Sequence, residues 1–255
     1  MDWLYPLSGF LVGLIVGVTG VGGGSLMTPL LVLLFGIQPA VAVGTDLLYA
    51  AFTKSVGVVA HSRQGNIDWK TLKLLAIGSL PATLITTWVL HTLNIDATRT
   101  AVLIKSTLGV ALLLTAAAII LRTRIIRFSR ESGWIKPHQV APATIFVGAF
   151  LGAMVTISSV GAGAVGVAAL FFLYPNMPVL RIVGTDIAHA VPLTLLAGLG
   201  HASLGTVDYT LLGNLLIGSV PGIWIGSQLS SRLPERWLRG SLATLLVLIG
   251  GKLVF

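Results

Sequence analysis

The sequence Val43-Gly44-Thr45-Asp46 recurs 140 positions later as Val183-Gly184-Thr185-Asp186. The same offset aligns further uncommon residues without a gap: His61, Gly65 and Asp68 with His201, Gly205 and Asp208; Gly78-Ser79-Leu80-Pro81 with Gly218-Ser219-Val220-Pro221; and Phe10-Leu11 with Phe150-Leu151. So many matches at one offset are not expected by chance, and duplicated halves are typical of transporter folds. The sequence therefore predicts two repeats, residues 1–121 and 140–255, joined by a basic segment, 122–139, within one membrane domain.

The composition places both repeats in a membrane. The chain has 255 residues, of which 55% are hydrophobic and 9% are charged, with a mean hydropathy of +0.95. Soluble domains carry about 25% charged residues. Apolar stretches about 20 residues long recur from end to end, which is the length of a transmembrane helix. The predicted fold class is an all-α polytopic membrane protein.

The positions of the basic residues indicate how the chain is oriented in the membrane. The formal net charge is +8 and the pI about 10.3, but the basic residues stand in short loops between apolar stretches, as the positive-inside rule expects. Nucleic acid is therefore not an expected partner. The chain has no cysteine, which excludes disulfides and thiolate metal sites, and no metal-ligand spacing or cofactor motif is evident. We expect neither a cofactor nor an enzymatic activity.

Each repeat contains a broken apolar stretch followed by three ordinary spans. The broken stretches are residues 4–35, interrupted at 19–24, and 141–174, interrupted at 158–164. The ordinary spans are about 40–60, 70–91 and 100–121 in the first repeat, and about 180–200, 210–230 and 240–255 in the second.

Counts of Lys and Arg predict how the chain crosses the membrane. The joining segment is strongly basic and is expected in the cytoplasm; its basic residues are Arg122, Arg124, Arg127, Arg130 and Lys136. Both termini are then outside the inner membrane of the cell, equivalent loops lie on opposite sides, and the repeats are inverted. Each broken stretch must begin and end on one side. We interpret both as re-entrant helical hairpins with arms of roughly fifteen residues, about 22 Å long, and two full crossings each would also satisfy the charges.

The interruptions of the broken stretches are the best candidates for a substrate site. Irregular backbone at membrane depth occurs where it is buried in protein or lines a cavity. A helix that begins there presents unpaired N–H groups that favour an anion, although small residues also serve close helix packing. The predicted substrate-binding residues of the two tips are Thr19, Gly22, Gly23, Gly24 and Ser25, and Ser158, Ser159, Gly161 and Gly163.

Two repeated dipeptides, Thr45-Asp46 and Thr185-Asp186, follow the broken stretches. Thr45 and Thr185 are predicted to contribute to substrate binding. Both aspartates lie a few residues into an apolar run, where carboxylates are costly and often functional. They could cap the helix, hold a hairpin tip, or bind a coupling proton, and the first two roles are favoured.

Lys54 and His189 are the remaining candidates. Lys54 lies in the middle of an apolar span, where it could attract an anion, extend to the membrane surface, or pair with Asp46. His189 follows Asp186 by one helical turn, and an Asp/His pair in a membrane could relay protons. By contrast, Asp68 and Asp208 are expected to be N-caps of the helices that follow them.

The sequence Gly17-Val18-Thr19-Gly20-Val21-Gly22-Gly23-Gly24, with Val43-Gly44-Thr45-Asp46 and the second copy of both, resembles the TauE/SafE sulfite exporter family, also called the toluene sulfonate uptake permeases. The resemblance covers nearly the whole chain. It implies transport of sulfite, thiosulfate or organosulfonates, often coupled to the proton gradient.

Two departures from the family pattern refine this expectation. In the second repeat, Ala162 and Ala164 stand at the positions that Gly22 and Gly24 occupy in the first. The two sides of the site are therefore expected to be unequal. The absence of cysteine disfavours thiosulfate uptake through thiol contacts. The predicted function is a secondary transporter, most simply an exporter, of a small sulfur-containing anion across the lipid bilayer. A passive anion channel and an uptake permease are the alternatives.

Overall fold

The computed structural model describes residues 3–19, 24–92, 97–132, 136–229 and 235–254, and all regular structure in these ranges is helical. The helices of the first repeat are α1 (Leu4–Thr19), α2 (Gly24–Leu33), α3 (Pro39–Arg63), α4 (Trp69–Thr92) and α5 (Ala97–Ser132). Those of the second are α6 (Pro137–Ser158), α7 (Ala164–Leu173), α8 (Val179–Ser203), α9 (Tyr209–Leu229) and α10 (Glu235–Val254). The predicted all-α class is confirmed. The second broken stretch is interrupted where the sequence indicates, between Ser158 and Ala164, whereas the interruption of the first lies mostly outside the described residues.

The fold is that of a multi-pass membrane protein. By length and composition, five helical segments of the described chain can cross a membrane: Trp69–Thr92, Thr100–Ser129, Pro137–Ser158, Val179–Ser203 and Tyr209–Gly226. Large apolar side chains face outward, among them Phe146 and Ile217, which are 74% and 70% exposed. A soluble protein rarely presents so much apolar surface, whereas lipid accommodates it.

Two of the predicted spans, 240–255 and 40–60, are not among these five segments. The apolar part of α10 is short, Gly240–Leu253. Helix α3 is 25 residues long but carries Asp46 and Lys54, both buried inside the protein, and these lower its apolar character. A helix whose polar residues face the protein interior can still contact lipid on its other face.

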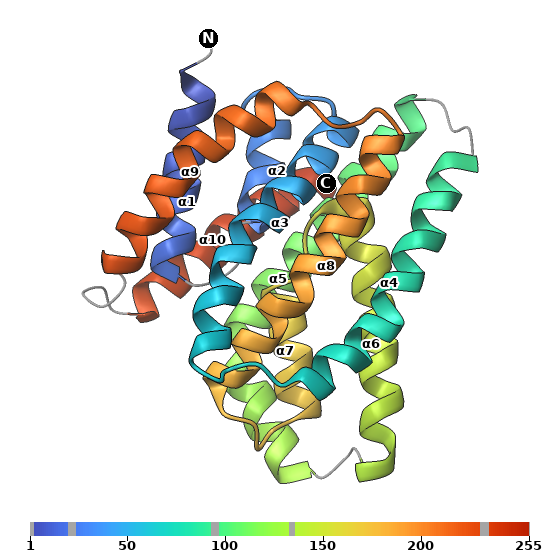
Figure 1. The fold of residues 1–255 in the computed structure, drawn as a ribbon, viewed down its shortest axis with the longest axis vertical. Coiled ribbons are helices and arrows are strands. Elements are labelled where there is room, and N and C mark those ends of the chain that lie inside the picture. The colour runs from blue at the N-terminus through green and yellow to red at the C-terminus, as the bar shows by residue number, and fades with distance from the viewer. Residues whose placement is uncertain (1–2, 20–23, 93–96, 133–135, 230–234, 255) are drawn as a thin grey trace.

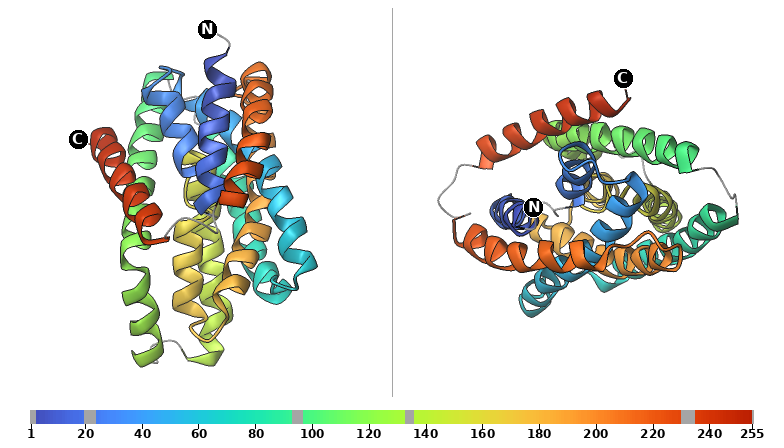
Figure 2. Two further views of the ribbon diagram at one scale, coloured as in Figure 1. Left: turned by 90° about the vertical axis from the view of Figure 1, so that its left-hand side faces the viewer. Right: turned by 90° about the horizontal axis from the view of Figure 1, so that it is seen from above.

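The helices form three layers (Figures 1 and 2). Seen from above, α5 and α10 lie on one side, α3, α4, α8 and α9 on the other, and the broken helices lie between them. The pair α1–α2 occupies the upper part of the molecule and α6–α7 the lower part, so the two breaks come from opposite ends toward the middle. Helix α3 descends in Figure 1 and its equivalent α8 ascends.

Glycines let the broken helices pack closely on their neighbours. A Cβ atom at Gly9 or Gly13 of α1 would overlap the backbone of Leu215 or Ser219 of α9. With the repeats exchanged, Gly148 and Gly152 of α6 stand in the same relation to Leu75 and Ser79 of α4. These small-xxx-small pairs are typical of membrane helix contacts. These contacts also correct the gapless alignment of the two repeats. Gly9 and Gly13 of α1 correspond to Gly148 and Gly152 of α6, an offset of 139, whereas the rest of the chain has an offset of 140.

The arms of the two hairpins are unequal, contrary to the expectation of about fifteen residues each. Helices α1 and α6 have 16 and 22 residues, whereas α2 and α7 have 10 each. Helix α6 alone is about 33 Å long, enough to cross the hydrocarbon core. The short arms are about 15 Å long and end at the turns that lead into α3 and α8.

The predicted caps are confirmed. Asp68 Oδ2 accepts a hydrogen bond from the Thr71 amide at 3.1 Å, and Asp208 Oδ1 accepts one from the Leu211 amide at 2.9 Å. Gly65 and Gly205 precede them with φ values of 69° and 70°, the left-handed conformation that glycine adopts without strain.

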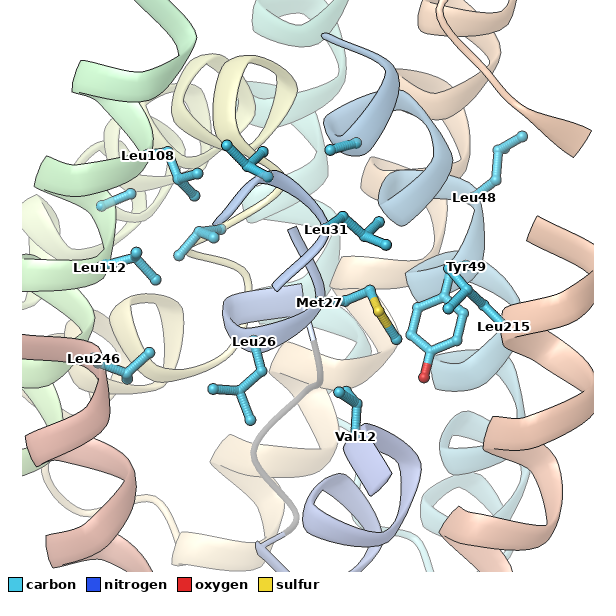
Figure 3. Packing of buried hydrophobic residues seen from close by; sticks show 14 of the residues in the cluster. Val12, Leu26, Met27, Leu31, Leu48, Tyr49, Leu108, Leu112, Leu215 and Leu246 are labelled. Carbon is cyan, nitrogen blue, oxygen red and sulfur yellow. The ribbon is translucent and has the colours of Figure 1, made fainter. Parts of the chain in front are cut away.

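The main apolar core holds α2 in place. Met27 and Leu31 are completely buried, and Figure 3 shows them between Tyr49 of α3 and Leu112 of α5. Helix α5 continues to Ser132, through most of the predicted joining segment. There it packs along α7, with the Ser129 hydroxyl donating to the carbonyl of Phe172.

Candidate functional site

The break between α6 and α7 brings irregular backbone into the protein interior. Ser159 ends α6 in a left-handed conformation with φ 60°, and Gly161 and Gly163 follow with φ values of 122° and 138°. Ser158 and Ser159 are buried. The Ser158 hydroxyl is used locally, because it donates to the carbonyl of Met154 at 2.7 Å and accepts from the amide of Val160 at 3.3 Å.

The equivalent break in the first repeat is only partly visible. Gly22 and Gly23 lie outside the described residues, while Thr19 ends α1 and Gly24 and Ser25 begin α2. The predicted roles of these five residues stay predictions.

Asp46 connects α2 with the break of the second repeat. Its carboxylate is completely buried, and Oδ2 accepts hydrogen bonds from the hydroxyls of Thr28 at 2.5 Å and Ser159 at 3.0 Å. Thr28 belongs to α2 and Ser159 to the α6–α7 break, so one carboxylate fixes both. The expectation that Asp46 holds a hairpin tip agrees with its contact to Ser159, in the break of the other repeat. The capping alternative is wrong, since α3 begins at Pro39, seven residues earlier.

Lys54 lies two turns further along α3 and contacts the same break. Its ammonium group donates to the carbonyl of Ala162 at 2.9 Å, and the residue is only 7% exposed. The side chain therefore does not extend to the surface. Its position gives it electrostatic interactions with Asp186 and Asp46, although its hydrogen bond goes to the backbone of the tip.

Asp186, the equivalent of Asp46, faces the start of α7. The residue is 1% exposed, and its Oδ1 atom has no hydrogen-bond partner. A Cβ atom at Gly166, in the first turn of α7, would overlap this oxygen. Only glycine therefore lets the carboxylate lie against that turn. Since α8 begins at Val179, Asp186 does not cap its helix either.

His189 lies one turn after Asp186 and is completely buried. Its Nε2 is 2.8 Å from the hydroxyl of Ser79 in α4, and Nδ1 has no hydrogen-bond partner. The equivalent position in the first repeat is Tyr49, whose hydroxyl is also buried without a hydrogen bond. The two repeats thus share a plan but differ in the groups that can carry a proton.

Together these groups form a buried charge cluster, defined as Asp46, Lys54, Asp186 and His189, on α3 and α8 beside the α6–α7 break. Buried charges are costly unless they are paired or used. Two carboxylates face one ammonium group here, so a second cation or proton can be accommodated. Within the described part of the chain, no group of three His, Asp or Glu residues has the arrangement of a metal site.

Thr45 and Thr185 are next in sequence to two aspartates of this cluster, but their hydroxyls bond to loops. The Thr45 hydroxyl accepts a hydrogen bond from the amide of Asp208 at 3.1 Å, and that of Thr185 accepts one from the amide of Asp68 at 2.8 Å. Each threonine thus fastens a loop of the other repeat. Their predicted part in substrate binding is not supported by this arrangement, since neither hydroxyl faces a break.

Sequence reasoning missed three partners of the cluster: Thr28, Ser79 and Gly166. Ser79 could have been found, because the repeated Gly-Ser-Leu-Pro motif places Ser79 and Ser219 at equivalent positions. Thr28 and Gly166 carry no such signal, since Ala168 stands where the second repeat would have Thr28.

Comparisons with known proteins agree with this picture. The model of the family "Sulfite exporter TauE/SafE" matches residues 5–253. The chain is 44% identical over 212 residues to the "Probable membrane transporter protein YjnA" of Bacillus subtilis, which covers 82% of this chain and 83% of the relative. It is 29% identical over 212 residues to YdhB of the same organism, with 81% of each chain covered.

A more distant relative carries the same description. A "Probable membrane transporter protein" of Xylella fastidiosa is 28% identical over 210 residues, which covers 80% of this chain and 75% of the relative. No solved structure matches the chain. The family match spans nearly every residue of both repeats, so the chain is a membrane transporter that belongs to the sulfite exporter TauE/SafE family.

Proposed function

We propose that this transporter exports a small sulfur-containing anion, such as sulfite or an organosulfonate, in a proton-coupled cycle. The substrate would bind beside the α6–α7 break, between α3 and α8. The observation that carries the proposal is the position of Lys54, a buried cation held at the break by the carbonyl of Ala162.

The chemistry of this position favours an oxyanion. An ammonium group has three donors, and Lys54 uses one of them on Ala162. Two remain for oxygen atoms of a substrate. In the first turn of α7 the amides of Gly166 and Val167 donate to the carbonyls of Gly161 and Gly163, which leaves those of Ala164 and Val165 for a substrate. The helix dipole favours negative charge at the same place. A sulfite or sulfonate group presents three oxygens, enough to accept hydrogen bonds from both the Lys54 ammonium group and the amides of α7.

We further propose that the repeats are inserted in opposite orientations, with both termini outside and the basic end of α5 in the cytoplasm. The exchanged contacts of α1 with α9 and α6 with α4, and the opposite courses of α3 and α8 (Figure 1), support this arrangement. Alternating access in transporters of this kind moves one repeat against the other around a central site.

The test is flux of radiolabelled sulfite and of a small sulfonate in proteoliposomes with an imposed pH gradient. We expect saturable flux that follows the gradient. Flux that ignores the gradient and does not saturate would identify a passive channel. No flux of any sulfur oxyanion in either direction would refute the proposal. Transport in the inward direction under a physiological gradient would identify an uptake permease.

A matched pair of lysine variants tests the site. Lys54 is buried, whereas Lys105 of α5 is exposed on the outer surface. We expect Lys54→Met to reduce the apparent affinity at least about tenfold, because a charge-assisted hydrogen bond is lost. Lys105→Met is expected to transport as the unaltered protein does. Equal flux in both variants would show that the substrate does not bind at Lys54.

A further inference from the structure

We propose that the Asp186 carboxylate is an internal counter-anion: it occupies the first turn of α7 when no substrate is bound and takes up one proton when the transported anion enters. This inference rests on the proposed function, and it assigns the coupling between anion and proton to one carboxyl group. It predicts that anion and proton are bound together.

Asp186 occupies a position beside the first turn of α7. Its Oδ1 lies against Gly166 at the start of α7 and accepts no hydrogen bond. A carboxylate near a helix N-terminus is stabilised by the dipole, so Asp186 sits in the position that favours an anion. Because no donor holds Oδ1, little must be broken for the group to give up that position.

The net charge of the cluster favours the uptake of one proton together with an anion. Asp46, Asp186 and Lys54 together carry one net negative charge when His189 is neutral. A monoanion that entered unaccompanied would place two negative charges in a buried site, where charges are weakly screened. Uptake of one proton by a carboxylate restores the original charge, and no other ion is needed.

Asp186 differs from Asp46 in its other hydrogen bonds, although Oδ1 has no partner in either residue. Asp46 Oδ2 accepts hydrogen bonds from two hydroxyls, those of Thr28 and Ser159, and hydrogen bonds to a carboxylate stabilise its charged form. Removing that charge would also loosen the contacts of α3 with α2 and with the α6–α7 break. The neighbour of Asp186 on its own helix face is His189, with an unpartnered Nδ1, so the proton has a relay beside it that Asp46 lacks.

Few other ionisable groups in the described chain face Asp186. Helix α7 contains none and α6 contains only His138, in its first turn. Helix α4 presents the hydroxyl of Ser79 toward α8 and carries its charged residues near its ends. The ionisable groups on α3, which packs along α8, are Asp46, Tyr49, Lys54, His61 and Arg63. Of these, Lys54 and Asp46 interact electrostatically with the cluster, and His61 lies beside Gly184.

The test measures binding, without transport, on the purified full-length protein. The probe is methanesulfonate, because a sulfonate keeps one negative charge throughout the pH range, whereas sulfite does not. For the unaltered protein, we expect the dissociation constant to rise with pH, by up to about tenfold per pH unit where Asp186 is charged in the free protein and protonated in the complex. We also expect uptake of about one proton per bound anion, read with a pH-indicator dye in weak buffer.

Three variants locate the proton. Asp186→Asn is expected to bind methanesulfonate with no pH dependence and no proton uptake. Asp46→Asn, the same change in the other repeat, is expected to keep the pH slope whatever happens to its affinity. His189→Gln is expected to keep the proton count and to slow its uptake. Loss of the count in His189→Gln alone would assign the proton to His189 and overturn the proposal.

The outcomes separate the two proposals. If the unaltered protein binds no sulfonate, sulfite or sulfate at any pH, the proposed function fails. If it binds methanesulfonate without a pH slope and without proton uptake, only the counter-anion fails. Should Asp186→Asn not fold, the proton counts of the unaltered protein, His189→Gln and Asp46→Asn decide the matter, because loss of the count in Asp46→Asn would assign the proton to Asp46 and overturn the proposal.

Discussion

The amide of Asp208 donates a hydrogen bond of 3.1 Å to the hydroxyl of Thr45, across 163 positions of the chain. The same contact occurs with the repeats exchanged, from the amide of Asp68 to the hydroxyl of Thr185 at 2.8 Å. Beside each threonine a glycine allows the loop to approach: a Cβ atom at Gly44 would overlap the carbonyl of Thr206. Thus each repeat fastens the loop of the other at opposite ends of the α3–α8 pair.

The first prediction concerns these two threonines. Replacing Thr45 or Thr185 with valine keeps the shape and removes the acceptor, leaving a loop amide without its partner. Interhelical hydrogen bonds in membrane proteins contribute roughly 0.6 kcal/mol on average, with a maximum of about 1.7 kcal/mol. We expect each variant to lose about 1 kcal/mol of unfolding free energy, measured by thermal or denaturant unfolding in detergent.

The control for this prediction is Thr53→Val. The Thr53 hydroxyl bonds to the carbonyl of Tyr49 within its own helix at 2.9 Å, so its removal leaves no amide unpaired. Unchanged stability in both Thr45→Val and Thr185→Val would show that the loops are held by packing alone.

A second prediction uses the ion pair at one of these loops. Arg181 Nη2 is 3.4 Å from Asp68 Oδ1, and the Arg181 side chain is half exposed. Exposed pairs contribute about 0–1 kcal/mol and are screened by salt. We therefore expect Arg181→Ala to be less destabilising than Thr185→Val, although the charged pair looks the stronger contact. A loss of stability larger than that of Thr185→Val, or one that grows with added salt, would contradict this ranking.

The sequence predicted the helices well because the signals for them are local. The apolar lengths, the capping aspartates and the duplicated Val-Gly-Thr-Asp motif each report on a few neighbouring residues. It also identified the four members of the buried charge cluster, since a charge inside an apolar run is rare and conspicuous.

What the sequence could not supply is the pairing of distant groups. Nothing in it indicates that Asp46 reaches Ser159, 113 positions away, or that Lys54 reaches Ala162. The expectation that Lys54 pairs with Asp46 considered only residues on the same helix. The unequal hairpin arms could have been found, because Pro175 stands two residues after the end of α7 at Leu173, a position where proline commonly follows a helix.

A third prediction concerns the glycines that bring α1 onto α9. A Cβ atom at Gly13 would overlap the backbone of Ser219, which cannot move without shifting the helix. We expect Gly13→Ala to destabilise the protein by about 1–3 kcal/mol, the usual cost of overpacking. The matched control is Gly213→Ala in α9, where a Cβ meets nothing within 4 Å. Alanine there should be neutral or stabilising by up to about 1 kcal/mol. Equal effects of the two changes in thermal unfolding would disprove the close contact.

The last prediction separates the two parts that Ser159 plays. Its left-handed backbone, with φ 60°, costs about 1–2 kcal/mol in a residue other than glycine, and its hydroxyl donates to Asp46. Ser159→Ala keeps the strain and removes the hydrogen bond, whereas Ser159→Gly removes both. We therefore expect Ser159→Gly to unfold at a higher temperature than Ser159→Ala. Both variants should transport more slowly than the unaltered protein, because neither holds the break to Asp46. Recovery of transport in Ser159→Gly together with its stability would mean that the hydroxyl has no part in the site, and that the conformation of the break alone is what transport requires.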